Sequence, residues 1–180
     1  HGVLQGLSEV KHIFLTISAC LVGLILAFPP IMSAIELPPE EVYAGHKLID
    51  DWNTEAAEHF TNALLKKYPK SGDAYFLKAR VEFLKGNHGL AAKILKQVTG
   101  NHSEVHEFKN LVYETYEETK LFATSESKHF IYRYQKGSDE ILVHYATKVL
   151  EKSYKILGKI FDYYPKEKVL VEFYPDRESF

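Results

Sequence analysis

Nine histidines and 24 acidic residues could hold a metal or move protons in this 180-residue chain. In the H-E-x-x-H pattern, two histidines at i and i+4 of one helix bind zinc, and the glutamate directly after the first activates the zinc-bound water. His102 and His106 have this spacing, but Glu104 stands one position beyond the required place. His129 falls in an expected strand, and His144 has no second ligand at helical spacing. We therefore predict no catalytic residue, no metal site and no cofactor in this chain.

Composition excludes several further classes of protein. The chain is 46% apolar and 26% charged, as in ordinary globular proteins rather than disordered or collagen-like chains. Its formal net charge of −2 gives no electrostatic reason to expect nucleic acid as a partner. The sequence has no glycine-rich phosphate loop and no G-x-S-x-G nucleophile turn. Cys20 is the only cysteine, so the chain after it can form no internal disulfide.

An uncharged segment near the amino terminus predicts export. Residues Ile13–Met32 carry no charge, follow Lys11, and lead to the small residues Ser33 and Ala34. The 16 residues before Pro29 would form a helix of about 24 Å, which is short for a membrane span and typical of a signal-peptide core. We expect residues 1–34 to be a leader and the protein to lie in the periplasm, cell envelope or extracellular space.

Two alternatives for the leader remain open. The segment is also compatible with a retained membrane anchor, and Ile17-Ser18-Ala19-Cys20 resembles a bacterial lipobox with a lipidated Cys20. The chain begins with His1 instead of Met and stops where a new helix would open. We therefore expect it to be a fragment of a longer protein.

A repeat of 34 residues follows the leader. Shifting the sequence by 34 positions pairs Gly45 with Ala79 and Ala57 with Ala91. Short helical segments joined by brief turns, repeated with this period, are typical of tetratricopeptide repeats, in which small residues occupy the helix crossings. In the first unit Ala56 fits the crossing as well as Ala57. The repeat-defining residues are Gly45, Ala57, Ala79, Gly86 and Ala91.

Residues 35–123 thus resemble two tetratricopeptide repeats followed by a capping helix over residues 101–122. In that family the first helices of the repeats build a concave face that binds peptides or partner proteins. The resemblance implies a binding face at His46, Ile49, Asp50, Phe76, Arg80 and Phe83. The alternative is that Phe76 and Phe83 are packing residues.

The pattern changes after residue 124. Residues 128–134 alternate as in a strand, 139–161 form a long amphipathic helix, and 168–175 form a second strand. The apolar helix positions are Ile141, Leu142, Tyr145, Val149, Leu150, Tyr154, Leu157, and Ile160 or Phe161, and the lysine-rich face is expected to be solvated. The predicted fold class is mainly α, with helical hairpins followed by an incomplete strand–long helix–strand unit.

The segments SKHFIYRY, LEKSYKILGKIFDYYP and KVLVEFYPDRESF resemble the opening of a peptidase MA-like domain, of the thermolysin-type gluzincin zinc metallopeptidases. This resemblance implies that residues 124–180 begin such a domain. It also implies zinc as a cofactor only if an H-E-x-x-H helix follows beyond Phe180. None of the quoted residues performs chemistry in that family.

The sequence therefore predicts an exported repeat protein whose full-length form is a zinc metallopeptidase. Its repeats would bind a protein or peptide partner, and it would meet a membrane only through an uncleaved leader. The alternative is a non-enzymatic scaffold of the cell envelope with a structural or degenerate peptidase-like domain. A third interpretation treats residues 124–180 as a plain α/β cap on the repeats.

Overall fold

The structure is a computed structural model that describes residues 36–99, 103–137 and 139–175. The expected leader, with Cys20, lies outside the described residues, as does His102. The helices are α2 (Pro39–Asp50), α3 (Thr54–Lys67), α4 (Gly72–Leu84), α5 (His88–Leu95), α6 (Ser103–Thr119) and α7 (Glu140–Phe161). The strands are β1 (Ala123–Glu126), β2 (Phe130–Tyr134) and β3 (Val169–Phe173).

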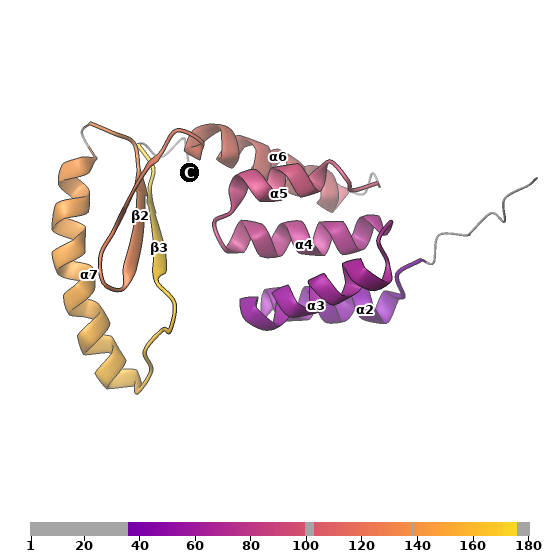
Figure 1. Ribbon diagram of the computed structural model, residues 1–180, viewed down its shortest axis with the longest axis horizontal. Helices are drawn as coiled ribbons and strands as arrows, with labels where there is room; N and C mark the ends of the chain where they lie inside the picture. The colour runs from indigo at the N-terminus through magenta and orange to yellow at the C-terminus, as the bar shows by residue number, and fades with distance from the viewer. Residues whose placement is uncertain (1–35, 100–102, 138, 176–180) are drawn as a thin grey trace, which may run out of the picture. The chain divides into compact units, whose positions relative to one another are not determined.

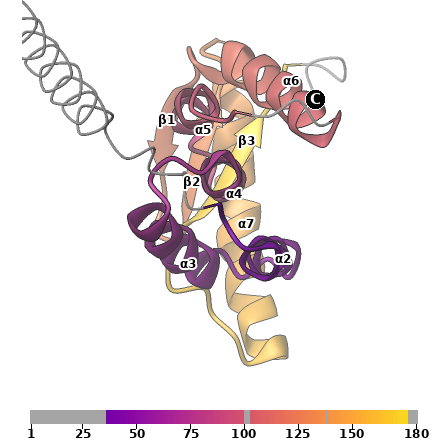
Figure 2. The same ribbon diagram turned by 90° about the vertical axis from the view of Figure 1, so that its right-hand side faces the viewer.

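The mainly helical fold class is confirmed. Helices α2 and α3 pack as one hairpin, α4 and α5 pack as the next, and α6 lies against α5 (Figures 1 and 2). A three-stranded sheet in the order β1-β2-β3, together with α7, follows the helices. These are the helical hairpins and the strand–long helix–strand unit that the sequence predicts.

The 34-residue period is visible in the backbone of the two turns. Trp52 has φ of 56° and Gly86 has φ of 74°, and these residues are 34 positions apart. The Trp52 N–H donates to Ile49 at 3.0 Å, and the Gly86 N–H donates to Phe83 at 2.9 Å. Since the left-handed conformation favours glycine, the second turn uses the less strained residue.

Polar side chains fix where the helices begin. Asn53 Oδ1 accepts from the Ala56 N–H, and Ser71 Oγ accepts from the Ala74 N–H, each at 3.3 Å. Helix α5 begins at His88, directly after the turn at Gly86 and Asn87. The reason is that the Asn87 carbonyl accepts the first helical bond, from the Ala91 N–H at 2.9 Å.

Small residues lie where the paired helices cross. Ala79 and Ala91 are fully buried and Ala57 is 1% exposed, whereas Ala56 is only half-buried. The crossing residue of the first unit is therefore Ala57. A Cβ atom on Gly45 would lie 2.6 Å from Leu77 Cδ1, so α2 can approach α4 only without a side chain there.

The sheet contains a strand that the sequence analysis missed. Strand β1 pairs antiparallel with β2, through Ala123 opposite Tyr134, in a segment that was expected to be a boundary. Strand β2 pairs parallel with β3, through Phe130 opposite Val169. Because parallel neighbours need a crossover, α7 connects them.

The two faces of the sheet meet different helices. Phe130 and Tyr132 pack against Val143, Leu150 and Tyr154 of α7. Alternate residues of β2 and β3 point the other way, towards the α4–α5 turn, where Leu170 meets Gly86. The sheet is thus covered on one face by α7 and contacted on the other by the second repeat (Figure 1).

The apolar positions expected on the long helix divide between its two faces. Leu150 and Tyr154 pack on the sheet. The others are exposed, namely Ile141, Leu142, Tyr145, Val149, Leu157, Ile160 and Phe161. A hydrophobic pattern indicates an amphipathic helix but does not by itself say which apolar residues the core covers.

Glu151 ties α7 to the loop before β2. Its carboxylate accepts from Ser127 Oγ at 2.6 Å and from the His129 N–H at 2.9 Å, and it lies 2.6 Å from His129 Nδ1. The His129 ring stacks on Tyr154 with centroids 3.8 Å apart. His129 is therefore a structural residue of the strand–helix unit.

The close approach at Gly45 makes a testable prediction. We expect Gly45→Val to lower the free energy of unfolding by about 1–3 kcal/mol, because the fully buried Leu77 must move. Urea denaturation followed by circular dichroism measures this loss. Tyr43→Val is the control, since Tyr43 is 71% exposed on the same helix. Equal midpoints for the two variants would contradict the close packing.

The hydrogen bonds to Glu151 predict how stability depends on pH. Those from Ser127 and His129 hold the pKa of the Glu151 carboxyl at about 2, against an ordinary value of 4.5. A depressed carboxyl pKa stabilises the folded chain above pH 4.5, and this contribution is lost as the pH falls from 4.5 towards 2. We expect Glu151→Gln to be less stable at pH 6 and to lack this loss.

Urea midpoints measured between pH 6 and pH 2 test this expectation. Glu114→Gln, at an exposed position of α6, is the control and is expected to follow the parent chain. A Glu151→Gln midpoint that falls as steeply with acid as that of the parent would contradict the assignment.

Candidate functional site

Three of the six residues predicted for the binding face meet around Arg80. Its Nη1 donates to His46 Nδ1 at 2.5 Å, and its Nη2 donates to Asp50 Oδ1 at 3.1 Å. Nη1 also lies 4.0 Å from Glu104 Oε1, near the start of α6. Helices α2, α4 and α6 thus contribute to one group of side chains, which we call the Arg80 cluster (His46, Asp50, Arg80 and Glu104).

The exposed part of the Arg80 cluster is acidic. The Asp50 and Glu104 side chains are 63% and 66% exposed, whereas that of Arg80 is 22% exposed. One guanidinium is shared between two carboxylates, so the cluster carries a net charge of −1 when His46 is neutral. An approaching molecule meets the carboxylates first.

The histidine of this cluster is held neutral. Burial and the neighbouring Arg80 charge lower the pKa of His46, and Glu104 and Asp50 offset only part of that effect. A neutral ring leaves Nδ1 free to accept from Arg80, which fixes the guanidinium in place. His46 therefore orients Arg80.

The remaining three predicted residues are apolar and lie deeper. Ile49 is 4% exposed, in the core shared by α2, α3 and α4, and Phe76 is 5% exposed. Phe76 and Phe83 each contact the Phe108 ring edge-to-face with centroids 5.5 Å apart. Ile49 and Phe76 are therefore core residues of the repeats and are not exposed to a partner.

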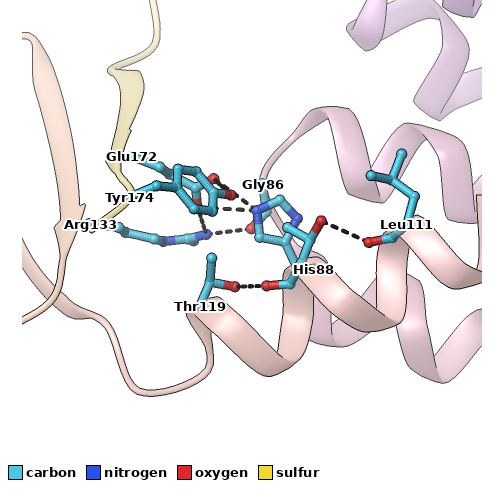
Figure 3. Close-up of polar contacts among 8 residues, drawn as sticks. Gly86, His88, Leu111, Thr119, Arg133, Glu172 and Tyr174 are labelled. Atoms are coloured by element: carbon cyan, nitrogen blue, oxygen red, sulfur yellow. Dashed lines mark hydrogen bonds and ion pairs between the residues drawn. The ribbon is translucent and has the colours of Figure 1, made fainter. Parts of the chain in front are cut away.

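A second polar cluster joins the turn before α5 to the sheet (Figure 3). His88 Nε2 lies 2.9 Å from Glu172 Oε2, and Arg133 Nη1 donates to Glu172 Oε1 at 3.2 Å. Arg133 Nη1 also donates to the Gly86 carbonyl, and the Tyr174 hydroxyl donates to Glu172 Oε2 at 3.3 Å. We call this group the Glu172 cluster (Gly86, His88, Arg133, Glu172 and Tyr174).

The Glu172 carboxylate stays charged although it is largely buried. Burial alone would raise the pKa of Glu172, but the hydrogen bond and charge of His88 and those of Arg133 outweigh it, and the pKa lies below its ordinary value. Burial and the same carboxylate raise the pKa of Tyr174 to about 12. Tyr174 is therefore a hydrogen-bond donor at physiological pH.

A cavity of about 480 Å³ lies beside this cluster. Its walls come from α4, α5, α6 and β3, and its lining residues are Phe83, Leu84, Gly86, His88, Leu111, Thr115, Leu170, Glu172 and Tyr174. His88 is 7% exposed, and its Nδ1 atom has no hydrogen-bond partner among the described residues. Phe83, predicted for the binding face, lines this cavity.

Sequence reasoning missed the Glu172 cluster because its members are far apart in the chain. His88 and Glu172 are separated by 84 positions. The available signal was the single acidic residue in the apolar strand VLVEF, since a buried carboxylate needs a cationic or donor partner. Within the described residues no group of three His, Cys, Asp or Glu side chains is suited to a metal ion.

The family model described as Iml2/Tetratricopeptide repeat protein 39 matches residues 5–166. This match covers most of the chain. The chain belongs to the Iml2/tetratricopeptide repeat protein 39 family. No curated protein and no solved structure gives a significant match. Membership confirms the tetratricopeptide-like repeats and with them a protein of the protein-interaction class.

The match extends from the expected leader into the strand–helix unit, so it covers most of the region that resembles a peptidase MA-like domain. Within the described residues, no helix has the length and apolar content that crossing a membrane requires.

The Glu172 cluster predicts that replacing the Glu172 carboxylate by an amide lowers the stability of the fold. We expect Glu172→Gln to lower the free energy of unfolding by about 1–3 kcal/mol, because Arg133 and His88 lose their charged partner. The stability of the parent chain should fall as acid titrates Glu172 below its ordinary pKa, and the variant, which still carries Glu151, should lose less. Urea midpoints at pH 7 and pH 4 measure both effects.

Tyr174→Phe is the control for this prediction. It removes one neutral donor from Glu172 and leaves the ion pairs, so it should cost less than Glu172→Gln. A Glu172→Gln chain as stable as the parent at pH 7 would show that the cluster does not hold the sheet to the repeats.

Proposed function

We propose that the protein binds a partner polypeptide across helices α2, α4 and α6, at the Arg80 cluster. Family membership supports the protein-interaction class. The convergence of polar side chains from three helices on Arg80 supports this place, and it is the observation that carries the proposal.

The charge of the cluster indicates what kind of segment it binds. Asp50 and Glu104 are the most exposed members, whereas Arg80 is half-buried and already paired. A basic side chain of the partner would meet two carboxylates held in fixed positions, and the attraction would steer its approach. The partner segment is therefore basic.

An apolar side chain of the same segment has a place in the cavity. Phe83 of α4 and Leu111 of α6 line it, so the helices that carry the Arg80 cluster also form part of its wall. Pockets of this size with apolar walls and a few polar groups commonly accept a buried anchor residue. We propose a segment that combines basic residues with one apolar anchor.

Export and zinc peptidase activity are further proposals that rest on the sequence alone. Export is supported by the uncharged segment Ile13–Met32, and peptidase activity by the resemblance of residues 124–180. The family match lends peptidase activity no support, because one family spans both the repeats and most of that region. The mass of the mature amino terminus and zinc-dependent proteolysis by the full-length protein test the two proposals.

Peptide selection tests the binding face. Peptides are selected from a random displayed library by the purified protein, and their affinities are measured by fluorescence anisotropy. We expect enrichment of Lys and Arg beside an apolar residue. Asp50→Lys combined with Glu104→Lys should weaken binding about tenfold, which corresponds to about 1.4 kcal/mol of lost attraction.

The matched control makes the same charge change away from the Arg80 cluster. Glu55→Lys with Glu117→Lys alters exposed residues of α3 and α6 that are not members of it. Circular dichroism melts confirm that both double variants fold. Selected peptides without basic residues, or equal losses in the two double variants, would contradict the proposed face.

A further inference from the structure

Helix α7 carries exposed apolar side chains on the side that does not face the sheet, in two groups that the turn with Lys152 and Ser153 separates. Tyr145 is 61% exposed, Val149 63%, Ile156 48% and Ile160 66%. Single exposed apolar residues are common on protein surfaces and need no explanation. Several large ones exposed together on one helix indicate an interaction surface. We call the residues Leu142, Tyr145, Val149, Ile156 and Ile160 the α7 stripe.

Helical geometry places this stripe opposite the buried face. At about 100° per residue from Val143, which packs on the sheet, Tyr145 lies at about 200° and Val149 at about 240°. Ile156 falls at about 220°, between them. Leu150 and Tyr154 fall within about 20° of Val143, and they pack on β2 as this geometry requires. Helix α7 is therefore apolar on two opposite sides.

A row of lysines runs beside the α7 stripe. Lys148, Lys152, Lys155 and Lys159 are spaced four, three and four residues apart and fall between about 120° and 180° on the same scale. All four are exposed, and none forms an ion pair within the described part of the chain. The outer side of α7 is thus half apolar and half basic along its length.

We propose that the outer side of α7 docks on a membrane surface that contains anionic lipids. The helix would lie in the plane of the interface, with the α7 stripe among the acyl chains and the lysines at the phosphate groups. A large apolar moment combined with a basic flank is the pattern of interfacial helices. Tyr145, Tyr163 and Tyr164 are exposed and suit the headgroup region, where an aromatic ring with a polar end is stable.

The shape of this surface favours a bilayer over a protein groove. The α7 stripe is the ridge of a single helix, and a protein partner would have to supply the whole groove around it. A bilayer accepts a convex ridge, and lysine side chains beside it can extend to the headgroups while their methylene chains stay apolar. The charge of the row selects anionic lipids, each lysine adding attraction near such a surface.

The proposal is independent of the peptide-binding face. The α7 stripe lies on α7, whereas the Arg80 cluster lies on α2, α4 and α6, and no residue belongs to both. Failure of one proposal leaves the other standing.

Flotation of the full chain with vesicles tests the membrane proposal. Vesicles of phosphatidylcholine alone are compared with vesicles that also contain phosphatidylserine. We expect binding to the anionic vesicles that weakens with salt. Val149→Glu with Ile156→Glu should lower it about tenfold, because two carboxylates would enter the acyl region. Lys148→Glu with Lys155→Glu should lower it similarly, and the control Lys66→Glu with Lys96→Glu should lower it less.

A fluorescent label separates α7 from the uncharged segment near the amino terminus. Cys20→Ser with Val149→Cys carries an environment-sensitive dye on the α7 stripe, and Cys20→Ser with Glu118→Cys carries it on α6. We expect a blue shift with anionic vesicles at position 149 only. Flotation without that shift would show binding through another segment and would overturn the proposal.

Two other outcomes would also overturn it. Sedimentation of the parent chain as a dimer that Val149→Glu with Ile156→Glu dissociates, without vesicle binding, would make the α7 stripe a self-association surface. Binding of a synthetic acidic amphipathic helix that the same variant abolishes, again without vesicle binding, would identify a protein partner.

Discussion

The contact between Gly86 and β3 is the constraint on which the arrangement of the described chain depends. The turn before α5 requires a positive φ at this residue, and its Cα faces Leu170 so closely that a Cβ atom would overlap Leu170 Cδ2. The Gly86 carbonyl also accepts from Arg133, which holds Glu172 in place beside His88. One residue without a side chain therefore serves the helix turn, the packing of the sheet and the ionic cluster together.

This contact also positions the surfaces on which the two proposals rest. With β3 held against the α4–α5 turn, the strand closes one side of the cavity that Phe83 and Leu111 line on the other. Helices α4 and α6, which line part of this cavity, also carry Arg80 and Glu104 of the Arg80 cluster, and the proposed basic segment would cross them. Helix α7 covers the opposite face of the sheet, and the outer side of α7 remains exposed.

Several features of the repeats could be predicted because they depend on local chemistry. Gly45, Ala79 and Ala91 mark close helix crossings, where only small residues fit, and each is buried as the 34-residue period requires. The resemblance to tetratricopeptide repeats implied only that His46, Asp50 and Arg80 share a face, and their hydrogen bonds to one another come from the structure. The contact between Glu104 and Arg80 could not be predicted in the same way, because a carboxylate in the first turn of a helix is equally typical of a cap.

The sequence by itself determined the helical hairpins, their turns and the strand–helix–strand order, because propensity, capping and periodicity act within a few residues. The tertiary structure alone decided that β1 pairs with β2 and that His88 meets Glu172. It also decided that Val149 faces away from the sheet whereas Leu150 faces it. These outcomes depend on contacts between segments far apart in the chain. A helix with apolar residues on two sides does not reveal which side the core will cover until the sheet is in place.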